Sequence, residues 1–313
     1  MDTLRILTSD VGFFTRQEAL SAGYAGRDIA RLVRNGEWVR FRRGAYAFAD
    51  EWRAWSAVTR HRVRCNAVLR SLGDVVALSH VSGVVRHDIE VWNLPLDRVH
   101  VTRLDGGPGR IEGDVIHHEG VALDDDVVVV DGQRVLRPER CVLEAGSRAS
   151  NEVALCLFDS GLRLEKYDVQ RLRDCHAQLQ FWPFMRHLAV PVRMADPRSG
   201  SVGESRGMWW FRAVGVPAPQ PQFEVCYPDG EVAGTCDWGW PEQGLLGEFD
   251  GRIKYGRLLK PGQEPGEVVF KEKEREDLLR ELSRFAMIRF VWSDYDDPQR
   301  LRVRLERMLY RAS

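Results

Sequence analysis

The chain lacks the features that identify several protein classes directly. Its six cysteines form no C-x-x-C pair, and no histidines follow them at zinc-finger spacing, which argues against a structural zinc site. No uninterrupted apolar run approaches the roughly 20 residues that span a bilayer. The N-terminus has no basic segment followed by an apolar one. We therefore expect no signal peptide, no membrane partner, reduced thiols and a cytoplasmic location.

Lysine is also scarce, since only five of the 45 basic residues are lysines. Those 45 positive charges balance 46 negative ones, so the net charge of −1 does not by itself indicate a nucleic-acid partner. The balance is uneven along the chain. Residues 1–70 hold 13 arginines against 7 aspartates and glutamates, a local excess of six positive charges (13 − 7). This basic segment is where a phosphate backbone would bind.

The length and composition predict a folded protein of several domains. The chain has 313 residues, of which 44% are hydrophobic and 29% charged, enough to bury a core and more than one domain usually holds. We expect an α+β or α/β multidomain protein with three parts. They are a winged helix-turn-helix at 1–50, an α/β linking domain at 51–195, and a mixed sheet flanked by helices at 196–313.

The first fifty residues have the pattern of a winged helix. Thr15 can cap a helix, with Glu18 three residues on at capping-box spacing. Residues 26–35 place Ile29, Leu32 and Val33 on one apolar stripe, which predicts a second helix. Residues 38–48 then alternate as two strands that turn near Arg43-Gly44.

The arginines of this segment are the candidate DNA-binding residues. A winged helix places its second helix in the major groove, and its hairpin reaches phosphates or the minor groove. An ordinary solvated basic face is the alternative. The coincidence of the charge excess with the helix and hairpin favours contact with double-stranded DNA. The candidates are Arg27, Arg31 and Arg34 on the helix, and Arg40, Arg42 and Arg43 on the hairpin.

The stretch TRQEALSAGYAGRDIARLVRNGEWVRFRRGAYAF resembles the N-terminal domain of AbiEi-type antitoxins. The resemblance covers about residues 3–50. It implies a winged helix that binds promoter DNA, and a cognate toxin protein as a second partner.

The middle region is predicted from local patterns alone. Residues 52–72 have a basic helical pattern, Ser79-His80 opens a helix that reaches about Val85, and residues 98–103, 114–118 and 126–130 have the pattern of strands. Two further helices are expected at 138–147 and 151–160. The pairs His117-His118 and Cys175-His176 raise the question of metal binding. Neighbouring residues of a strand point to opposite faces, so His117 and His118 are not expected to bind one ion.

The C-terminal region concentrates acidic residues on predicted strands. A helix beginning at Ser201 or Ser205 carries Glu204, and strands are expected at 222–227, 235–240 and 245–250. Asp237 falls on the second of these strands. Glu248 and Asp250 fall on the third, two residues apart and therefore on one face. Because acids that converge repel one another unless they share a cation, we expect Asp237, Glu248 and Asp250 to bind Mg²⁺ or Mn²⁺.

The blocks GESRGMWWFRAVGVPAPQPQFEV and CDWGWPEQGLLGEFDGRIKYG resemble the PD-(D/E)XK nuclease superfamily, and more narrowly the very-short-patch repair endonucleases. EKEREDLLRELSRFAMIRFVWSD is similar to the closing helix and strand of that fold, so the resemblance spans about 200–297. It implies a restriction-endonuclease-like sheet in which Glu204 supports the metal ligands. Lys254 would replace the lysine of the motif, because Asp250 occupies the lysine's usual place.

Two functions follow from these features. The first is a DNA-directed, Mg²⁺-dependent endonuclease that hydrolyses phosphodiester bonds in genome defence, repair or a toxin–antitoxin context. The acidic residues favour this function. The alternative is a non-enzymatic AbiEi-like antitoxin and transcriptional repressor whose nuclease-like domain has lost its activity, and the N-terminal resemblance favours it.

Overall fold

The computed structural model describes residues 3–121, 124–251 and 265–310. Within them the strands form three sheets, each accompanied by helices, in keeping with the expected mixed α/β multidomain class. The chain packs as two compact units. Unit 1 contains Met1–Ser150 and Lys166–Val190, and unit 2 contains Asn151–Glu165 and Pro191–Ser313. The segment Asn151–Glu165, which we expected in the middle domain, thus packs with the C-terminal part.

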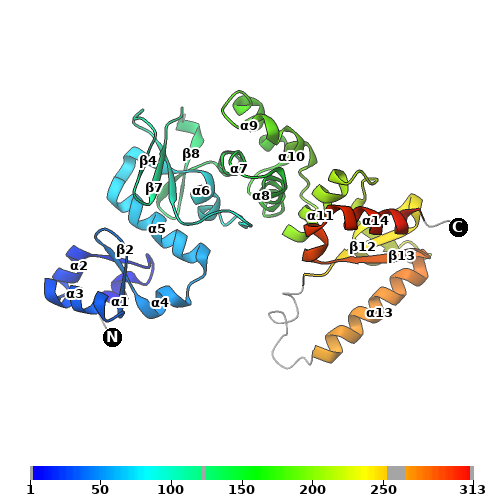
Figure 1. Ribbon diagram of the computed structural model, residues 1–313, viewed down its shortest axis with the longest axis horizontal. Helices are drawn as coiled ribbons and strands as arrows, with labels where there is room; N and C mark the ends of the chain where they lie inside the picture. Colours follow the sequence, from blue (N-terminus) through cyan, green and yellow to red (C-terminus); the bar gives the residue numbers. More distant parts are fainter. Residues whose placement is uncertain (1–2, 122–123, 252–264, 311–313) are drawn as a thin grey trace. The chain divides into compact units, whose positions relative to one another are not determined.

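The start of unit 1 folds as a winged helix (Figure 1). Its elements are α1 (Thr3–Thr8), β1 (Phe14–Thr15), α2 (Arg16–Ser21), α3 (Gly26–Arg34), β2 (Trp38–Arg42) and β3 (Ala45–Phe48). Thr15 and Glu18 form the predicted capping box at the start of α2. Gly44 takes a φ of +79° in the turn between β2 and β3, a conformation that favours glycine. The three strands have the order β1-β3-β2.

Aromatic side chains fill the core of the winged helix. Phe14 and Trp38 meet edge to face with ring centroids 4.6 Å apart, and Tyr46 and Phe48 pack around them. Ile29 and the neighbouring leucine on α3 are buried against this cluster, as the apolar stripe predicted. The opposite face of α3 is left to solvent.

The rest of unit 1 is a six-stranded sheet with helices. Its elements are α4 (Ala49–Ala54), α5 (Ala57–Leu72), η1 (Gly73–Val75), β4 (Val76–Leu78), α6 (His80–Arg86), β5 (Val99–Arg103), β6 (Arg110–Glu112), β7 (Val115–His118), η2 (Asp124–Asp126), β8 (Val127–Val130), β9 (Gln133–Leu136), α7 (Pro138–Gly146), α9 (Val169–Leu179) and η3 (Arg186–Leu188). The strand order is β6-β7-β5-β4-β9-β8, in which β5 pairs with β7, and β4 with β9, in parallel. The predicted strands and the helices expected after Ser79 and at 138–147 are present, whereas the single helix expected at 52–72 is divided into α4 and α5 by the extended residues Trp55 and Ser56.

The winged helix is anchored to α5. Phe13, Ala45, Val63 and Ala67 form a buried apolar cluster between the wing and this helix. Phe41 on β2 stacks on a tryptophan of α4 with ring centroids 4.8 Å apart. The wing is therefore held by apolar packing along one side.

Unit 2 is built on a four-stranded mixed sheet. Its elements are α8 (Asn151–Arg163), α11 (Val202–Ala213), β10 (Gln220–Cys226), β11 (Val232–Trp240), η4 (Pro241–Gln243), β12 (Leu245–Phe249), α13 (Pro265–Ser283), β13 (Ala286–Phe290), η5 (Trp292–Asp296) and α14 (Pro298–Leu309), together with most of α10 (Ala189–Met194). The strand order is β10-β11-β12-β13. The first two pairings are antiparallel, and β13 lies parallel to β12.

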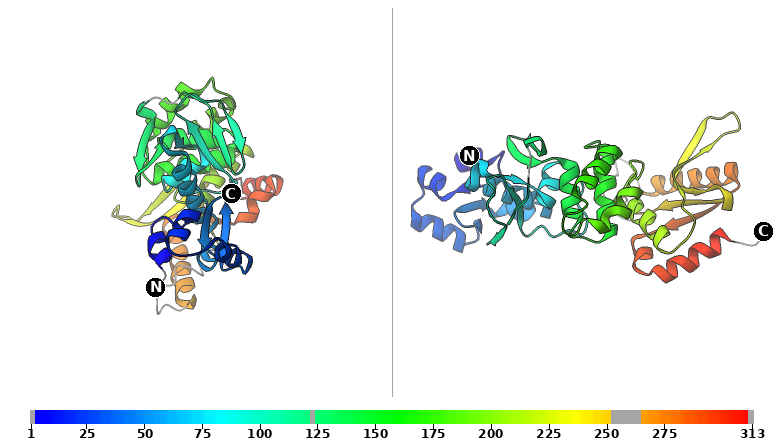
Figure 2. Two further views of the ribbon diagram at one scale, coloured as in Figure 1. Left: turned by 90° about the vertical axis from the view of Figure 1, so that its left-hand side faces the viewer. Right: turned by 90° about the horizontal axis from the view of Figure 1, so that it is seen from above.

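Helices cover both faces of this sheet (Figures 1 and 2). Phe211 of α11 packs with Trp238 and Phe290 on one face, where α14 also contributes leucines. On the other face Leu246 packs against Leu279 of α13. The expected arrangement of a helix, three strands, a helix and a last strand is therefore present.

Helix α8 packs on α11 within unit 2. Glu152 on α8 accepts a hydrogen bond from Arg206 Nε at 2.6 Å and another from Trp210 Nε1 at 2.8 Å. Arg163 donates to the carbonyl oxygen of Ser199 at 2.8 Å. These polar contacts flank a buried apolar run, 153–158, on α8.

Candidate nucleic-acid interface

Helix α3 presents a row of arginines on the face opposite its buried side chains. Arg27, Arg31 and Arg34 lie at positions i, i+4 and i+7, and all three are exposed. Arg31 makes only a long ion pair, 3.5 Å, with Asp28 on the same helix. Exposed pairs of this kind are weak, so these guanidinium groups remain available to phosphates or base edges.

The wing divides its three arginines between two environments. The pairing of β2 with β3 shifts register between Arg40 and Arg42, and such a bulge changes the direction of the side chain that follows it. Arg42 is only partly exposed and forms an ion pair with Asp114 of the β6–β7 turn. Arg40 and Arg43 are exposed and make no ion pair with any residue that the structure describes. Of the three, Arg42 is thus the one with an acidic partner, and DNA contact by these arginines stays a prediction.

Other arginines of the basic segment have structural partners. Arg5 pairs with Asp50 and Glu51, and Arg70 pairs with Glu18 at 2.6 Å. Those of α4 and α5 donate mainly to backbone carbonyl oxygens: Arg53 to Gly36, Arg60 to Trp52, Arg62 to Val85 and Arg64 to Leu96. The charge excess in the sequence therefore separates into arginines that hold unit 1 together and arginines that face solvent on α3 and the wing.

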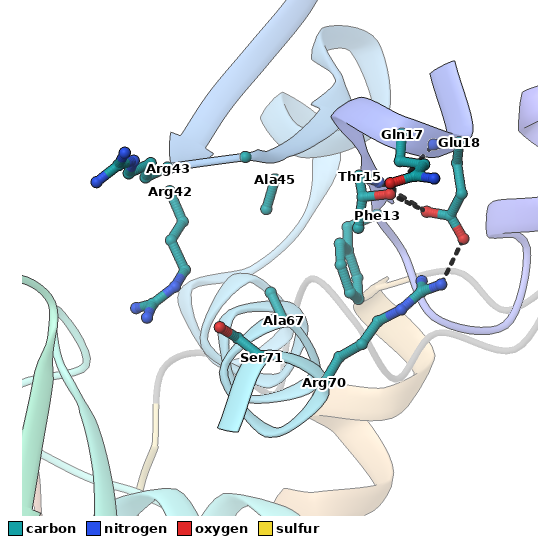
Figure 3. A pocket seen from close by; sticks show the side chains of 11 residues that line it. Phe13, Thr15, Gln17, Glu18, Arg42, Arg43, Ala45, Ala67, Arg70 and Ser71 are labelled. Carbon is teal, nitrogen blue, oxygen red and sulfur yellow. Dashed lines mark hydrogen bonds and ion pairs between the residues drawn. The ribbon is translucent and has the colours of Figure 1, made fainter. Parts of the chain in front are cut away.

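A hollow of about 460 Å³ lies between the wing, α2 and α5 (Figure 3). Phe13 and Ala45 line it, and Arg42, Arg43 and Arg70 stand at its walls. Figure 3 shows Arg43 directed away from the hollow, whereas Arg70 reaches Glu18 across it. The positive charge inside is therefore partly neutralised, and the exposed arginines outside it form the better surface for an anion.

Three of the four acidic residues singled out in the C-terminal region, Glu204, Asp237 and Glu248, have local side-chain partners. Glu204 is buried in the first turn of α11: Ser201 Oγ donates to its carboxylate at 2.9 Å, and the carboxylate also accepts from the backbone N–H of Gly200 at 2.8 Å. Gln222 donates a further hydrogen bond to Glu204 at 2.9 Å. These three bonds use most of its capacity as an acceptor.

Asp237 and Glu248 lie on the neighbouring strands β11 and β12, as predicted, and have different surroundings. One oxygen of Asp237 accepts the backbone N–H of Phe249 at 2.7 Å. Glu248 is buried, forms an ion pair with Arg275 of α13, and lies 3.6 Å from a guanidinium nitrogen of Arg289 on β13. Two guanidinium groups thus oppose the charge of Glu248.

The four acids are not drawn to one point in the described structure. Asp250 follows the end of β12, and its backbone N–H donates to the carbonyl oxygen of Phe290 at 2.7 Å. Lys254 lies outside the described residues. Within the part of the chain that the structure describes, no three of these carboxylates come within 4.8 Å of one another. Tyr295 lies near Asp237 and Glu204. Burial raises the pKa of its hydroxyl well above the ordinary value.

Sequence patterns did not identify the two arginines that meet Glu248. Arg275 lies in the charged stretch 271–284, whose sequence does not indicate a partner outside the helix. Only the packing of α13 on the sheet brings it to β12. Arg289 lies on β13, and its register beside Glu248 follows from the parallel pairing of β12 with β13.

The comparisons with known proteins concern mainly the winged helix. Residues 2–49 match the sequence profile of a family described as "Transcriptional regulator, AbiEi antitoxin". This match confirms the N-terminal resemblance and ends before the region compared with nucleases. A solved structure of the RV2827C protein from Mycobacterium tuberculosis is similar with a TM-score of 0.38 and 13% identity, covering 73% of this chain and 90% of that one. No curated protein sequence matches the chain. Among the described residues, no helix has both the length and the apolar character needed to cross a bilayer.

Proposed function

We propose that this chain is a regulator that binds double-stranded DNA through α3 and the wing, as an antitoxin-type transcriptional repressor. The observation that carries the proposal is the row of exposed arginines on α3, joined by Arg40 and Arg43, within the segment that matches the AbiEi family. In this arrangement α3 enters the major groove and the wing contacts the backbone. A cognate toxin is the second partner proposed, on the family description alone.

Salt-dependent DNA binding tests the interface. Fluorescence anisotropy with duplex DNA from upstream of the chain's own gene is measured over a range of KCl concentrations. Each lost phosphate contact lowers the slope of log K against log salt by about 0.9. The triple variant Arg27→Ala/Arg31→Ala/Arg34→Ala is expected to lose sequence preference and affinity, and the double variant Arg40→Ala/Arg43→Ala to lose about two units of slope.

A matched control comes from α14. Arg302 and Arg307 are exposed there, so Arg302→Ala/Arg307→Ala removes the same two charges from unit 2. The control is expected to bind DNA as the unaltered chain does. Equal loss of slope in the control and the wing variant would refute the interface, because net charge alone would then explain the binding.

A metal-dependent endonuclease is the second candidate. The order α11, β10, β11, β12, α13, β13, with Asp237 and Glu248 on adjacent strands, favours it. The arginines opposite Glu248 and the local hydrogen bonds of the Glu204 carboxylate favour the repressor. No observation of this structure supports a Mg²⁺ or Mn²⁺ ion at Asp237, Glu248 and Asp250, so a role for the metal rests on the resemblance.

A cleavage assay separates the two candidates. Supercoiled, linear and mismatched DNA are incubated with the chain and Mg²⁺, Mn²⁺ or chelator. Under the repressor proposal no metal-dependent product forms while DNA binding is normal. Metal-dependent cleavage that disappears in Asp237→Ala and Glu248→Ala, with binding retained, would establish the nuclease instead.

A further inference from the structure

Three histidines that are distant in the sequence meet in unit 1. His80 is the first residue of α6, His100 lies in β5, and His118 ends β7. In the parallel pairing of β5 with β7, His100 stands opposite Ile116, and Thr102 opposite His118. His100 and His118 are therefore two positions apart on the same face of the sheet.

Helix α6 begins beside this face. The backbone N–H of Ser79 donates to the carbonyl oxygen of His100 at 3.1 Å, which brings the next residue, His80, over the strand. His80 has a φ of +48°, uncommon for a residue with a side chain, and strained backbone of this kind is found most often at functional sites.

The ring nitrogens of the three histidines lie close together. One nitrogen from each of the three rings lies within 4.8 Å of the other two, the one such group among the described residues. Nδ1 of His100 and Nε2 of His118 are 3.0 Å apart. In a tetrahedral zinc site, Zn–N bonds of about 2.0–2.1 Å place two nitrogens roughly 3.3 Å apart. The ring of His80 stacks on that of His118 with centroids 3.7 Å apart, so one of these two rings must rotate before both direct a nitrogen lone pair at the same ion.

Outer contacts fix the orientation of His80. Its Nδ1 forms a hydrogen bond of 3.1 Å with the hydroxyl of Ser79 and lies 3.2 Å from Oε2 of the buried Glu144, an ion-pair distance without hydrogen-bond geometry. Nε2 is then the nitrogen of His80 that is left for an ion. Arg140 Nε in turn donates to Glu144 Oε1 at 2.9 Å. A carboxylate behind a histidine is the usual outer partner of a metal-bound imidazole, because it fixes the tautomer and raises the basicity of the ring.

A hollow of about 130 Å³ opens beside the histidines. His80, His118 and Thr102 line it, and Arg148 stands at its wall. The hydroxyl of Thr102 is buried and has no hydrogen-bond partner among the described residues. A buried polar atom without a partner marks a place for a water or an ion, and the hollow has room for a fourth ligand.

We propose that His80, His100 and His118 form a binding site for a divalent transition-metal ion of the zinc type, with a water molecule as the fourth ligand in the adjacent hollow. Three imidazoles suit Zn²⁺ and exclude hard ions such as Mg²⁺. The ion joins the start of α6 to β5 and β7, so it stabilises unit 1. The site is independent of the proposed DNA interface.

Binding of Zn²⁺ to the full chain, freed of metal with a chelator, tests the proposal. Isothermal titration with ZnCl₂ is expected to give one ion per chain. Co²⁺ in place of Zn²⁺ is expected to give the visible absorption of a tetrahedral site. Because the ion binds only the folded state, the midpoint of thermal unfolding rises with free Zn²⁺.

Substitutions assign the ligands. His80→Gln, His100→Gln and His118→Gln are each expected to abolish stoichiometric binding, and Glu144→Gln to weaken it by about 10–100-fold. His117→Gln is the matched control, since His117 is adjacent in sequence, buried, and on the opposite face of β7. His187→Gln, which is exposed, is the control for adventitious surface binding.

Circular dichroism checks that each variant is folded. If a glutamine variant does not fold, the conservative variant His100→Cys is loaded with Co²⁺ instead. A thiolate that binds the ion adds a charge-transfer band to the Co²⁺ spectrum, which identifies residue 100 as a ligand. The absence of Zn²⁺ binding to the unaltered chain would overturn the site. Equal loss of binding in His117→Gln or His187→Gln and in His118→Gln would also overturn it.

Discussion

Arginine side chains in the winged helix either hold a fixed acidic partner or face solvent, and the neighbouring residues Arg42 and Arg43 illustrate the two cases. Arg43 is exposed, whereas the side chain of Arg42 is 19% exposed and paired with Asp114, whose side chain is 30% exposed. A residue with a fixed partner contributes to folding, and an unpaired one at the surface contributes to binding an anion. The sequence Arg42-Arg43 contains no sign of this difference, which arises from the bulge in β2.

The first prediction separates these two uses. Arg42→Ala is expected to lower the free energy of unfolding by about 1 kcal/mol and leave the salt slope of DNA binding unchanged. Arg43→Ala is expected to lower the salt slope of DNA binding and leave the free energy of unfolding unchanged. Urea denaturation of both variants, with Asp114→Ala and the double variant Arg42→Ala/Asp114→Ala completing a cycle, measures the coupling. Additive effects of the two single changes would show that the pair does not stabilise unit 1.

The second prediction concerns a buried acid on α8. Burial raises the pKa of Asp159 to about 7, against the opposing effect of the backbone N–H of Asp196, which donates to it at 2.9 Å. The folded chain therefore keeps this proton to about pH 7, whereas an unfolded aspartate releases it near pH 4. Between these values the folded state holds more protons, so stability falls as pH rises, by about 1.4 kcal/mol per pH unit.

Asp159→Asn is expected to remove that dependence while keeping the oxygen that accepts from Asp196. Melting temperatures of the variant and the unaltered chain are compared from pH 5 to pH 8. The variant should gain relative stability up to about pH 7 and hold that gain above it. Glu242→Gln, an exposed acid of the same unit, is the control and should follow the unaltered chain. Parallel curves for Asp159→Asn and the control would contradict the raised pKa.

At the scale of elements, the capping box of α2 links a helix start to the rest of unit 1. Thr15 Oγ accepts the backbone N–H of Glu18 at 3.2 Å, and Glu18 accepts the backbone N–H of Thr15 at 2.7 Å. The other oxygen of Glu18 meets Arg70 on α5. The same short motif therefore starts α2 and ties it to the neighbouring helix.

The third prediction is that Thr15→Ala lowers stability by about 1 kcal/mol, a usual cost of losing an N-cap side chain. Thr15→Ser keeps the hydroxyl and should retain most of that stability. Denaturant titration of both variants measures the difference. A loss in the serine variant equal to that in the alanine variant would assign the effect to the methyl group and not to the cap.

Elements with strong local signals are the ones that the sequence predicts well. The capping box, the apolar stripe of α3 and the hairpin turn at Gly44 depend on neighbouring residues, and all are present. The histidine cluster has no such signal, because residues 80, 100 and 118 meet only through strand register and the start of α6. The alternation of a strand separates His117 from His118, but it does not identify the residues elsewhere in the chain that lie close to His118.

The acidic site shows the same limit. The placement of Asp237 and Glu248 on adjacent strands follows from the strands predicted at 235–240 and 245–250, and the structure has it. Their charge environment depends on how α13 packs across the sheet, which no local pattern specifies. Arg275 therefore enters the surroundings of Glu248 only in three dimensions.

For the whole molecule, the division into units does not follow the order of the sequence. The chain passes between the units three times, after Ser150, Glu165 and Val190. Helix α8 belongs to unit 2 through its contacts with α11, although residues 166–190 return to unit 1. A cut at residue 190 therefore removes a helix from the second unit.

The fourth prediction is that a fragment of residues 151–313 folds more stably than one of residues 191–313. The shorter fragment loses Glu152, the acceptor of Arg206 and Trp210, and exposes the face of α11 that α8 covers. Circular dichroism melts of the two fragments measure the difference. A fragment of 191–313 as stable as the longer one would show that α8 contributes nothing to unit 2.

The position of α8 has a consequence while the chain is being made. Its apolar run, 153–158, leaves the ribosome before its partner α11, which ends 50 residues after α8 (213 − 163). At 5–20 residues per second, this interval lasts roughly 3–10 s. Residues 166–190, the last segment of unit 1, are synthesised in that time. Unit 1 is therefore fully synthesised while α8 still lacks α11 as a packing partner. During translation, this helix is therefore a surface on which a chaperone can act.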